Sequence, residues 1–549
     1  MASKIQNMKK NIIFYLTAIT MVATMSGCQK KIDEAFANPN ASVRVPIETL
    51  LPGIIGNFVG SSAAAGSAYG TANDGLYVGR YVQYWATNSA GNQYDQMGGA
   101  TGASDILGSV WAMHYFGMGE NLNKMVKWGI EEEKWDYVGV GYAIRAWSWL
   151  TLTNMYGEVI MREAFRPEQL VFKYDAQKDV YDTVRAIARM AISYLERTDG
   201  KVSQSNLAKG DAFFYNGDVN KWKKFVYTVM ARSFNHLSNK ADYKADSVIK
   251  YALLGINSNA DNASAKFANT GITGTSNFYG PYRNNVGALR QTEYIANLMS
   301  GLNTRFTGAV DPRAWYMLRE NTNNTIRGIK LNKGASGLVT NDQPQGFWGQ
   351  TFGTASAPVS DAACRYIFKN GSPFPIITAS ENKFILAEAY LRKGDVNSAL
   401  TAYKDGISLN FDMLVNDYAA GVPAARLITP TMKTTYLTNP VVVPSASNLS
   451  LSHIMLQKYI ALYGFGMLET WVDMRRFHYS DLDEKAGGQV YADLVMPTGI
   501  DLFINNSGKL TYRARPRYNS EYLYNVAELQ RLGALALDYS TKEQWFSQK

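Results

Sequence analysis

The chain has 549 residues, with 55 Lys and Arg against 46 Asp and Glu, so its formal net charge is +9. The basic residues are scattered singly among acids, which argues against a nucleic-acid binder, because such a protein gathers Lys and Arg into a stripe. Two cysteines exclude a disulfide-rich fold, so stability must come from core burial in a chain longer than one hydrophobic core usually spans.

An export signal precedes the body of the chain. Lys9-Lys10 gives a short positive stretch, Ile12 to Met25 is mostly apolar, and Ser26-Gly27 places small residues just before Cys28. This lipobox pattern predicts a lipid on Cys28, and an ordinary cleaved signal with a chance cysteine is the alternative. The apolar run is shorter than the roughly 20 residues of a membrane-spanning helix. The predicted divisions are a signal peptide over 1–27, a lipidated tether over 28–44 and one domain over 45–549.

Helical periodicity predicts the first elements of the body. The apolar stretch Ile47–Val59 indicates a first helix. Four later amphipathic segments, rich in aromatic residues, are expected to be helices: Asp105–Trp128, Tyr137–Met155, Asp179–Arg197 and Trp222–Ser238. Two other segments, 258–287 and 321–358, are rich in Gly, Asn and Thr and predict long irregular loops, which usually carry function.

A helix-pair repeat is indicated in the second half of the chain. With Leu386 at position 7 of a tetratricopeptide repeat, Tyr390, Gly394, Ala399 and Tyr403 fall at positions 11, 15, 20 and 24. The repeat needs a small residue where its helices cross and a glycine where the chain turns. Because one repeat cannot bury its own face, further helix pairs are expected to stack beside it.

Six segments carry motifs that follow one another along the chain. They are Tyr142–Ile160, with Arg145-Ala146; Trp222–Asn235; Asp311-Pro312-Arg313; Pro375–Arg392; Ile454–Phe477, with Trp471, Asp473 and Arg475-Arg476; and Arg515–Asn525. Each motif is weak alone. Together, in this order and behind a lipobox, they resemble the SusD/RagB family of outer-membrane lipoproteins, and most closely its SusD-like 2 subgroup.

The resemblance implies a fold and a partner. The fold is mainly α and SusD-like, with tetratricopeptide-like helix pairs packed against an irregular, loop-rich, ligand-binding half. The partner is a SusC-like, TonB-dependent outer-membrane barrel, over which such proteins form a lid. The resemblance implies binding without catalysis, and a lipid-anchored position on the outer membrane, exposed at the cell surface.

The charged residues at the motif positions are interpreted as structural. They are Arg145, Arg232, Asp473, Arg475 and Arg476. Arginine on an aromatic-rich helix commonly pairs with a carboxylate and caps neighbouring carbonyls across stacked helices, because its planar fork suits that role. Glu388, between two alanines, is expected to be a buried partner of such an arginine.

Neither a metal site, a cofactor nor a catalytic group is predicted. The four histidines, His114, His236, His453 and His478, are far apart and form none of the known metal-binding patterns. The sequence also marks out no two carboxylates for glycoside hydrolysis.

Aromatic loops are the predicted ligand site. An aromatic content of 13% with only 18% charged residues is typical of exported proteins that hold polar, weakly charged ligands. A sugar ring stacks its apolar face on an aromatic ring while amide and guanidinium groups bind its hydroxyls. In the family, ligand contacts often come from the early region. The predicted residues are Trp85 and Asn88, then Arg80, Tyr81 and Tyr84 in the same stretch, Tyr279 and Tyr282 in a second group, and Trp348 in a third.

An alternative interpretation places Tyr81, Tyr84 and Trp85 on one face of a buried helix.

For function, the sequence favours a surface-tethered protein that captures oligosaccharide or polysaccharide fragments for the transporter. Capture of peptides, as in RagB-type importers, is the second hypothesis. A lipid-anchored repeat scaffold that binds only proteins is the third.

Overall fold

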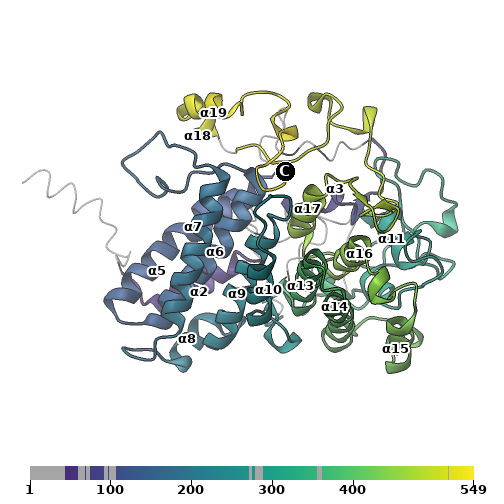
Figure 1. Ribbon diagram of the computed structural model, residues 1–549, viewed down its shortest axis with the longest axis horizontal. Helices are drawn as coiled ribbons and strands as arrows, with labels where there is room; N and C mark the ends of the chain where they lie inside the picture. Colours follow the sequence, from purple (N-terminus) through teal and green to yellow (C-terminus); the bar gives the residue numbers. More distant parts are fainter. Residues whose placement is uncertain are drawn as a thin grey trace, which may run out of the picture. The chain divides into compact units, whose positions relative to one another are not determined.

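The computed structural model describes residues 44–59, 69, 74–91, 95, 97, 107–270, 275–277, 288–354, 361–516 and 519–549. Residues Ile47–Lys549 form one compact unit. Helices dominate the described residues, and their strands form three two-stranded sheets, so the predicted mainly α fold class is confirmed (Figure 1). None of the described helices is both long and apolar enough to cross a membrane.

The elements follow in chain order. The helices up to residue 299 are α2 (Leu50–Gly56), α3 (Asp74–Tyr81), α4 (Ser109–Ala112), α5 (Glu120–Glu131), α6 (Trp135–Tyr156), α7 (Gln177–Leu195), α8 (Gln204–Asp211), α9 (Val219–Asn235), α10 (Ala245–Leu254) and α11 (Glu293–Met299). The later helices are α12 (Ala314–Met317), α13 (Ala379–Lys393), α14 (Val396–Asp417), α15 (Pro430–Thr438), α16 (Leu451–Ala461), α17 (Met467–Arg476), α18 (Asn519–Tyr524) and α19 (Val526–Leu532). The strands are β1 (Trp85–Thr87), β2 (Ala263–Ala265), β3 (Leu289–Gln291), β4 (Phe374–Ile377), β5 (Leu482–Asp483) and β6 (Gly488–Gln489).

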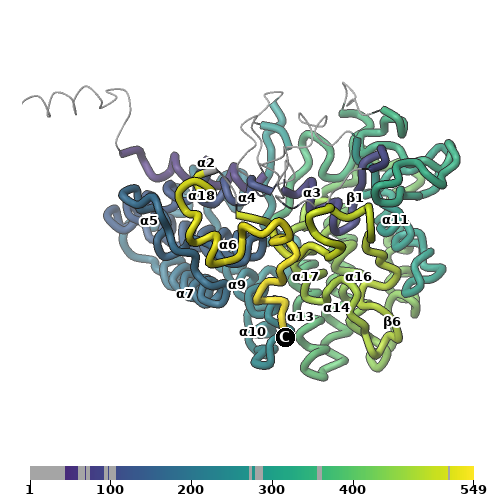
Figure 2. Tube along the Cα trace, turned by 90° about the horizontal axis from the view of Figure 1, so that it is seen from above, coloured from purple at the N-terminus to yellow at the C-terminus, as the bar shows by residue number. Residues whose placement is uncertain are grey.

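The long helices form a continuous row. Helix α5 packs on α6, α6 on α7, α7 on α9, α9 on α10, α10 on α13, and α13 on both α14 and α16 (Figures 1 and 2). Helix α6 is buried on almost every side, as expected for a helix at the centre of a stack. It ends at Gly157, whose φ of 85° reverses the chain while its N–H donates to the carbonyl of Thr153.

Four of the five segments predicted to be helical each contain one main helix, α2, α6, α7 or α9. The fifth, Asp105–Trp128, is interrupted by a π-helical turn, Met113–Gly119, between α4 and α5. The close approach of Phe165 accompanies this wider turn, since a Cβ on Gly119 would lie 2.1 Å from its ring. Only a residue without a side chain fits there.

The predicted helix pair around Leu386 is formed by α13 and α14. Gly394 turns the chain between them in the left-handed region, with φ of 86°, and Gly406 of α14 lies against the ring of Phe384. A Cβ on Gly406 would come within 2.9 Å of that ring. The small residue at this helix crossing therefore sets how closely the pair packs.

Thr378 caps the first helix of this pair, because its side chain accepts a hydrogen bond from the N–H of Glu381. We expect Thr378→Ala to lower the free energy of unfolding by about 1 kcal/mol, the usual value for a lost N-cap. Urea unfolding followed by circular dichroism measures this difference. Thr378→Ser, which keeps the hydroxyl, is the matched control and should stay near wild type.

Buried ion pairs join α13 to α9 and to α17. Arg232 of α9 binds both oxygens of Glu381 on α13, at 2.6 Å each. Arg476 of α17 binds Glu388 of α13 at 2.7 and 2.9 Å and Asp473 at 2.7 Å. All five side chains are buried. The predicted structural role of these residues, and of Glu388 as a buried partner, is confirmed.

Two other motif arginines have neutral partners. Arg145 donates to the amide oxygen of Asn123 at 2.7 Å. Arg475 donates to the carbonyls of Asn154 and Tyr512 at 2.8 and 2.9 Å. Burial without a carboxylate partner lowers the pKa of Arg475 to about 10. Neither arginine has a carboxylate partner among the described residues, but Arg475 caps carbonyls of neighbouring segments as expected, and the role of both is structural.

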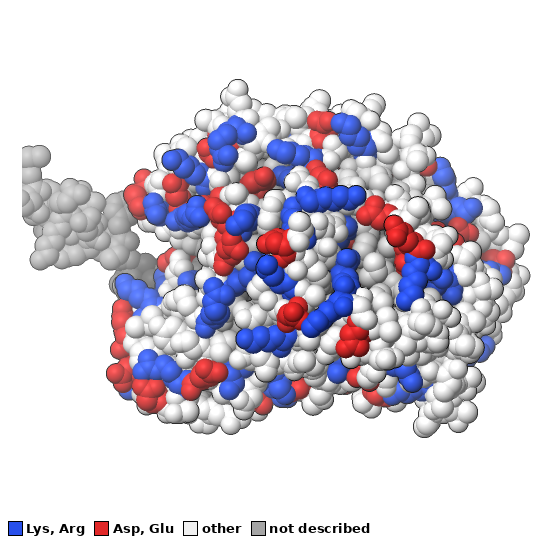
Figure 3. Space-filling view, in the orientation of Figure 1, with Lys and Arg blue, Asp and Glu red and all other residues white. Residues whose placement is uncertain are grey.

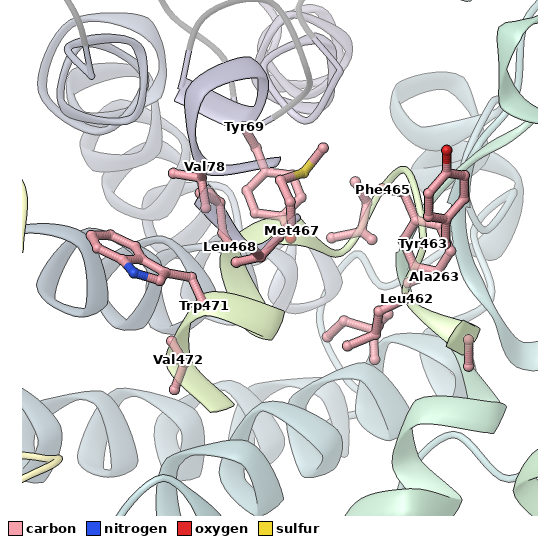
Figure 4. Close-up of a cluster of buried hydrophobic side chains, with 14 of the residues drawn as sticks. Tyr69, Val78, Ala263, Leu462, Tyr463, Phe465, Met467, Leu468, Trp471 and Val472 are labelled. Atoms are coloured by element: carbon pink, nitrogen blue, oxygen red, sulfur yellow. The ribbon is translucent and has the colours of Figure 1, made fainter. Parts of the chain in front are cut away.

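Helix α17 lies at the centre of an apolar cluster that holds α3 in place. Figure 4 shows Met467, Leu468 and Trp471 of α17 close to Tyr69 and Val78, the latter on α3. All of these side chains are buried. The early segment that contains α3 is thus packed against a helix almost 400 residues later in the chain.

Candidate functional site

The early aromatic segment is a helix, a turn and a strand. Helix α3 ends at Tyr81, and after a turn β1 pairs antiparallel with β3, with Trp85 opposite Gln291. Tyr84 therefore lies in the turn and Trp85 in the strand, so the alternative of one continuous buried helix is wrong in geometry. It is right about burial, since the exposed fractions of Tyr81, Tyr84 and Trp85 do not exceed 1%.

The polar atoms of these three rings are hydrogen-bonded inside the protein. The Tyr81 hydroxyl accepts from the N–H of Thr511 at 2.7 Å. The Tyr84 hydroxyl donates to the carbonyl of Tyr459 at 2.8 Å, and the Trp85 indole N–H donates to the carbonyl of Leu76 at 2.9 Å. A buried ring with a satisfied polar atom has no face left for a sugar.

Trp348, the predicted aromatic of the third group, is also buried, with an exposed fraction of 1%. Its ring meets Phe368 edge-on at 6.3 Å, and the neighbouring Phe347 stacks on Phe368 at 4.3 Å. The expectation that Tyr81, Tyr84, Trp85 and Trp348 contact a ligand is therefore corrected: their rings fill the core beneath the loops.

The half-buried polar residues of the same segment remain accessible. Asn88 donates to the carbonyl of Phe352 at 2.9 Å, which joins the first predicted group to the segment just after Trp348. Arg80 lies over the ring of Tyr77, 5.1 Å from its centre, and burial lowers the pKa of its guanidinium. The second group, with Tyr279 and Tyr282, lies outside the described residues, as does Cys28.

A cleft of about 370 Å³ opens beside this segment. Its walls come from three stretches of chain that are far apart in sequence, and Gln83, in the turn between α3 and β1, also lines it. The lining stretches are Thr292–Asn303 around α11, Ile329–Lys333, and Asp493–Asp501. The volume lies at the small end of the range for ligand pockets.

Backbone pairing fixes the cleft next to the predicted segment. Ala90 forms an antiparallel bridge with Lys333, and the N–H of Gly91 donates to the carbonyl of Asn332 at 3.0 Å. Gln83 donates to the carbonyl of Val495 at 2.7 Å. Residues 83–91 therefore bond to two of the three walls of the cleft. The early segment predicted from the sequence thus lies beside the cleft, although its aromatic rings do not line it.

Four of the five charged groups that line the cleft form pairs. Lys333 binds Asp501 at 2.9 Å, and Lys330 lies 4.0 Å from Glu293. The fifth, Asp493, accepts hydrogen bonds from Thr304, so the cleft has no cluster of positive charge. Lys and Arg are likewise interspersed with Asp and Glu over the face of the molecule shown in Figure 3. The arrangement suits a neutral polar ligand better than a polyanion.

Two polar groups of the cleft have no partner among the described residues. Asn297, half-buried on α11 one turn after Glu293, has no side-chain hydrogen bond. The hydroxyl of Tyr294 is buried without a hydrogen-bond partner, and burial together with the charge of Asp493 raises its pKa. Nothing in the sequence marked Asn297, because its place in the cleft depends on chain segments 200 residues later.

In the described part of the chain, no three His, Cys, Asp or Glu side chains come close enough together to hold a metal ion. His114, for example, is buried and contacts Ser148 at 2.5 Å, and burial lowers its pKa to about 3. The predicted absence of a cofactor stays a prediction.

Comparison with known proteins gives a consistent result. The SusD-like 2 family model, described as "Starch-binding associating with outer membrane", matches residues 53–500. No curated protein matches the chain. Among solved structures, a SusD/RagB family protein from Bacteroides thetaiotaomicron is 18% identical over 92% of this chain and 99% of its own, with a TM-score of 0.65.

Two further structures have the same fold. A chitin-binding protein is 18% identical over 92% of this chain and 100% of its own, with a TM-score of 0.67. A SusD homolog from Bacteroides fragilis is 18% identical over 91% of this chain and 99% of its own, with a TM-score of 0.66. The fold is therefore shared along almost the whole length of these chains.

Proposed function

Because this chain belongs to the SusD-like 2 family, we propose that it captures oligosaccharide or polysaccharide fragments at the cell surface. The family description names starch binding, and one structure with the same fold is a chitin-binding protein. The protein binds its ligand without chemical conversion. The match over residues 53–500 is the observation that carries this proposal.

Two further parts of the proposal concern location and partner. Lipid on Cys28 anchors the chain to the outer membrane, and the family description places its members there. A SusC-like, TonB-dependent barrel receives the captured ligand. Sequence motifs support both parts, through the lipobox at Cys28 and the family order of the motifs from Tyr142 to Asn525.

We place the ligand in the cleft beside residues 83–91. A sugar needs amide and charged groups for its hydroxyls and apolar surface for its ring face. Asn297 offers a free amide, and Lys333 and Asp501 offer charged groups on the other two walls. Leu331 and Met496 supply apolar surface.

The half-buried Arg80 and Asn88, in the segment that adjoins the cleft, extend the proposed site. Tyr279 and Tyr282, predicted from the sequence, remain part of it. Ring stacking, if the ligand requires it, therefore rests on these tyrosines and not on Trp85.

Binding of the chain from residue 29 onward to a panel of polysaccharides and a mixed peptide digest tests the proposal. That form keeps the whole compact unit Ile47–Lys549. We expect one class of glycan to bind, and Asn297→Ala to weaken it about fivefold to tenfold, the effect of one lost hydrogen bond. Calorimetry measures the change.

The matched control is Asn448→Ala, an exposed asparagine in a 3-10 turn away from the cleft, which should leave binding unchanged. Binding of peptides alone would favour the RagB-type hypothesis. No binding to either panel by a folded protein would favour the scaffold hypothesis. If Asn297→Ala bound the glycan as tightly as the wild type, the proposed function would stand, but the ligand site would lie outside this cleft.

A further inference from the structure

A second cavity, of about 290 Å³, lies between α2, the end of α8 and the chain around β2. Helix α2 and the end of α8 form two of its walls. These two helices pack on each other (Figure 1). The third wall is the chain after β2, where the N–H of Lys266 donates to the carbonyl of Phe213 at 2.8 Å. None of the residues lining the first cleft takes part in it.

The walls of this cavity are mainly apolar. Ile55 and Val59 are buried on the α2 side, and Phe267 is half-buried on the opposite side. Phe213 also lines the cavity and leaves 54% of its surface exposed. A large exposed aromatic ring beside an open apolar cavity is unfavourable in water, and a ligand that covers it removes this surface from solvent.

The exposed charged side chains that line this cavity are both lysines. Lys209 and Lys266 are exposed lining residues, and neither forms an ion pair or side-chain hydrogen bond in the described structure. The charge of Lys266 acts on Asp417, with which it forms no ion pair. Asp211, the acid among the lining residues, points inward, and its two oxygens accept from the N–H of Gly217 at 2.6 Å and the indole N–H of Trp222 at 2.9 Å.

We propose that this cavity binds a small organic anion with an apolar body and a single carboxylate. The body contacts Ile55, Val59, Phe213 and Phe267, and the carboxylate meets Lys209 and Lys266. This site is separate from the glycan cleft. Alkyl and aryl carboxylates share the required chemistry, and the measurement below distinguishes them.

The test is calorimetric titration of the chain from residue 29 onward with decanoate, trans-cinnamate and the neutral decan-1-ol. We expect saturable binding of one or both carboxylates, and decan-1-ol to bind at least tenfold more weakly. Whichever of decanoate and cinnamate binds more tightly shows whether the ligand body is alkyl or aryl. Equal binding of decanoate and decanol would overturn the role of the lysines.

Variants locate the site. Lys209→Gln and Lys266→Gln should each weaken the carboxylate roughly fivefold, as expected for one exposed charge pair. Lys244→Gln, an exposed lysine before α10, is the matched control. Ala268→Trp, which fills the cavity from an exposed position, should abolish binding while the protein stays folded.

Carboxylate binding that persists in Ala268→Trp, or no saturable binding in the wild type, would overturn the proposal. Glycan binding measured on the same Ala268→Trp protein should be unchanged. The proposals for the two sites are therefore tested independently of each other.

Discussion

Glu388→Gln should lower the free energy of unfolding by about 3–5 kcal/mol, the range measured when one partner of a buried ion pair is removed. Glu388 accepts from Arg476 at 2.7 and 2.9 Å, from Arg392 at 2.9 Å and from Asn235 at 2.9 Å. The variant leaves the buried guanidinium of Arg476 with only Asp473 as a charged partner. Denaturant unfolding at pH 7 measures the loss.

The same pair predicts a pH dependence. The charges of Arg476 and Arg392 hold the pKa of Glu388 below its ordinary value of 4.5. A lowered pKa stabilises the fold above the ordinary value, and this contribution is lost as the pH falls below it. The stability of the wild type should therefore fall more steeply from about pH 5 downward than that of Glu388→Gln.

Asp412→Asn is the matched control for Glu388→Gln. Asp412 also forms an ion pair, with Lys433 at 2.6 Å, but 46% of its side chain is exposed. Its removal should change the free energy of unfolding by at most about 1 kcal/mol. If both variants lost the same amount, the network of α9, α13 and α17 would not be the source of stability that its burial indicates.

Trp85→Ala should destabilise the protein by about 3–5 kcal/mol, because it removes a fully buried ring and the hydrogen bond to Leu76. Any loss of ligand binding in this variant would then reflect disturbed packing under the site. Thermal unfolding and binding should be measured on the same sample. A stable Trp85→Ala protein without glycan binding would contradict our assignment of this ring to the core.

Gly79 gives a sharper test of the same packing. A Cβ at this position would lie 2.2 Å from the Trp85 ring, so Gly79→Ala in the wild type should cost about 1–3 kcal/mol through overpacking. In the Trp85→Ala background the clash is absent, and alanine favours a helix over glycine by about 1 kcal/mol. The second substitution should then be neutral or stabilising, and additive losses would contradict the close contact.

The sequence was most informative about features that depend on neighbouring residues, such as the periodicity of a buried helix. Periodicity located α6, α7 and α9, because each buries a face or its whole surface. The Ala-Glu-Ala run around Glu388 indicated a buried carboxylate, because small neighbours let an arginine approach it. These features depend on residues within a few turns of one helix.

The cleft could not be predicted, because no short stretch of chain contains it. Asn297, Lys333 and Asp501 come together only when β3, the loop after it and the C-terminal segment have packed. The aromatic run from Tyr77 to Trp85 was misjudged for the same reason. Its rings have the composition of a sugar site, but Tyr81, Tyr84 and Trp85 are buried by packing against segments far along the chain.

The hydrogen bonds of α3 and β1 also determine when this part of the chain can fold. Tyr81 and Tyr84 are bonded to Thr511 and Tyr459, and Gln83 to Val495, so their partners lie between 375 and 430 residues later. Contacts of such sequence separation form slowly, since a long loop must close before they contribute. The segment beside the cleft can therefore complete its fold only after the C-terminal part of the chain has been synthesised and has packed against it. The proposed ligand cleft, whose walls include residues from both regions, would then be among the last parts of the domain to form.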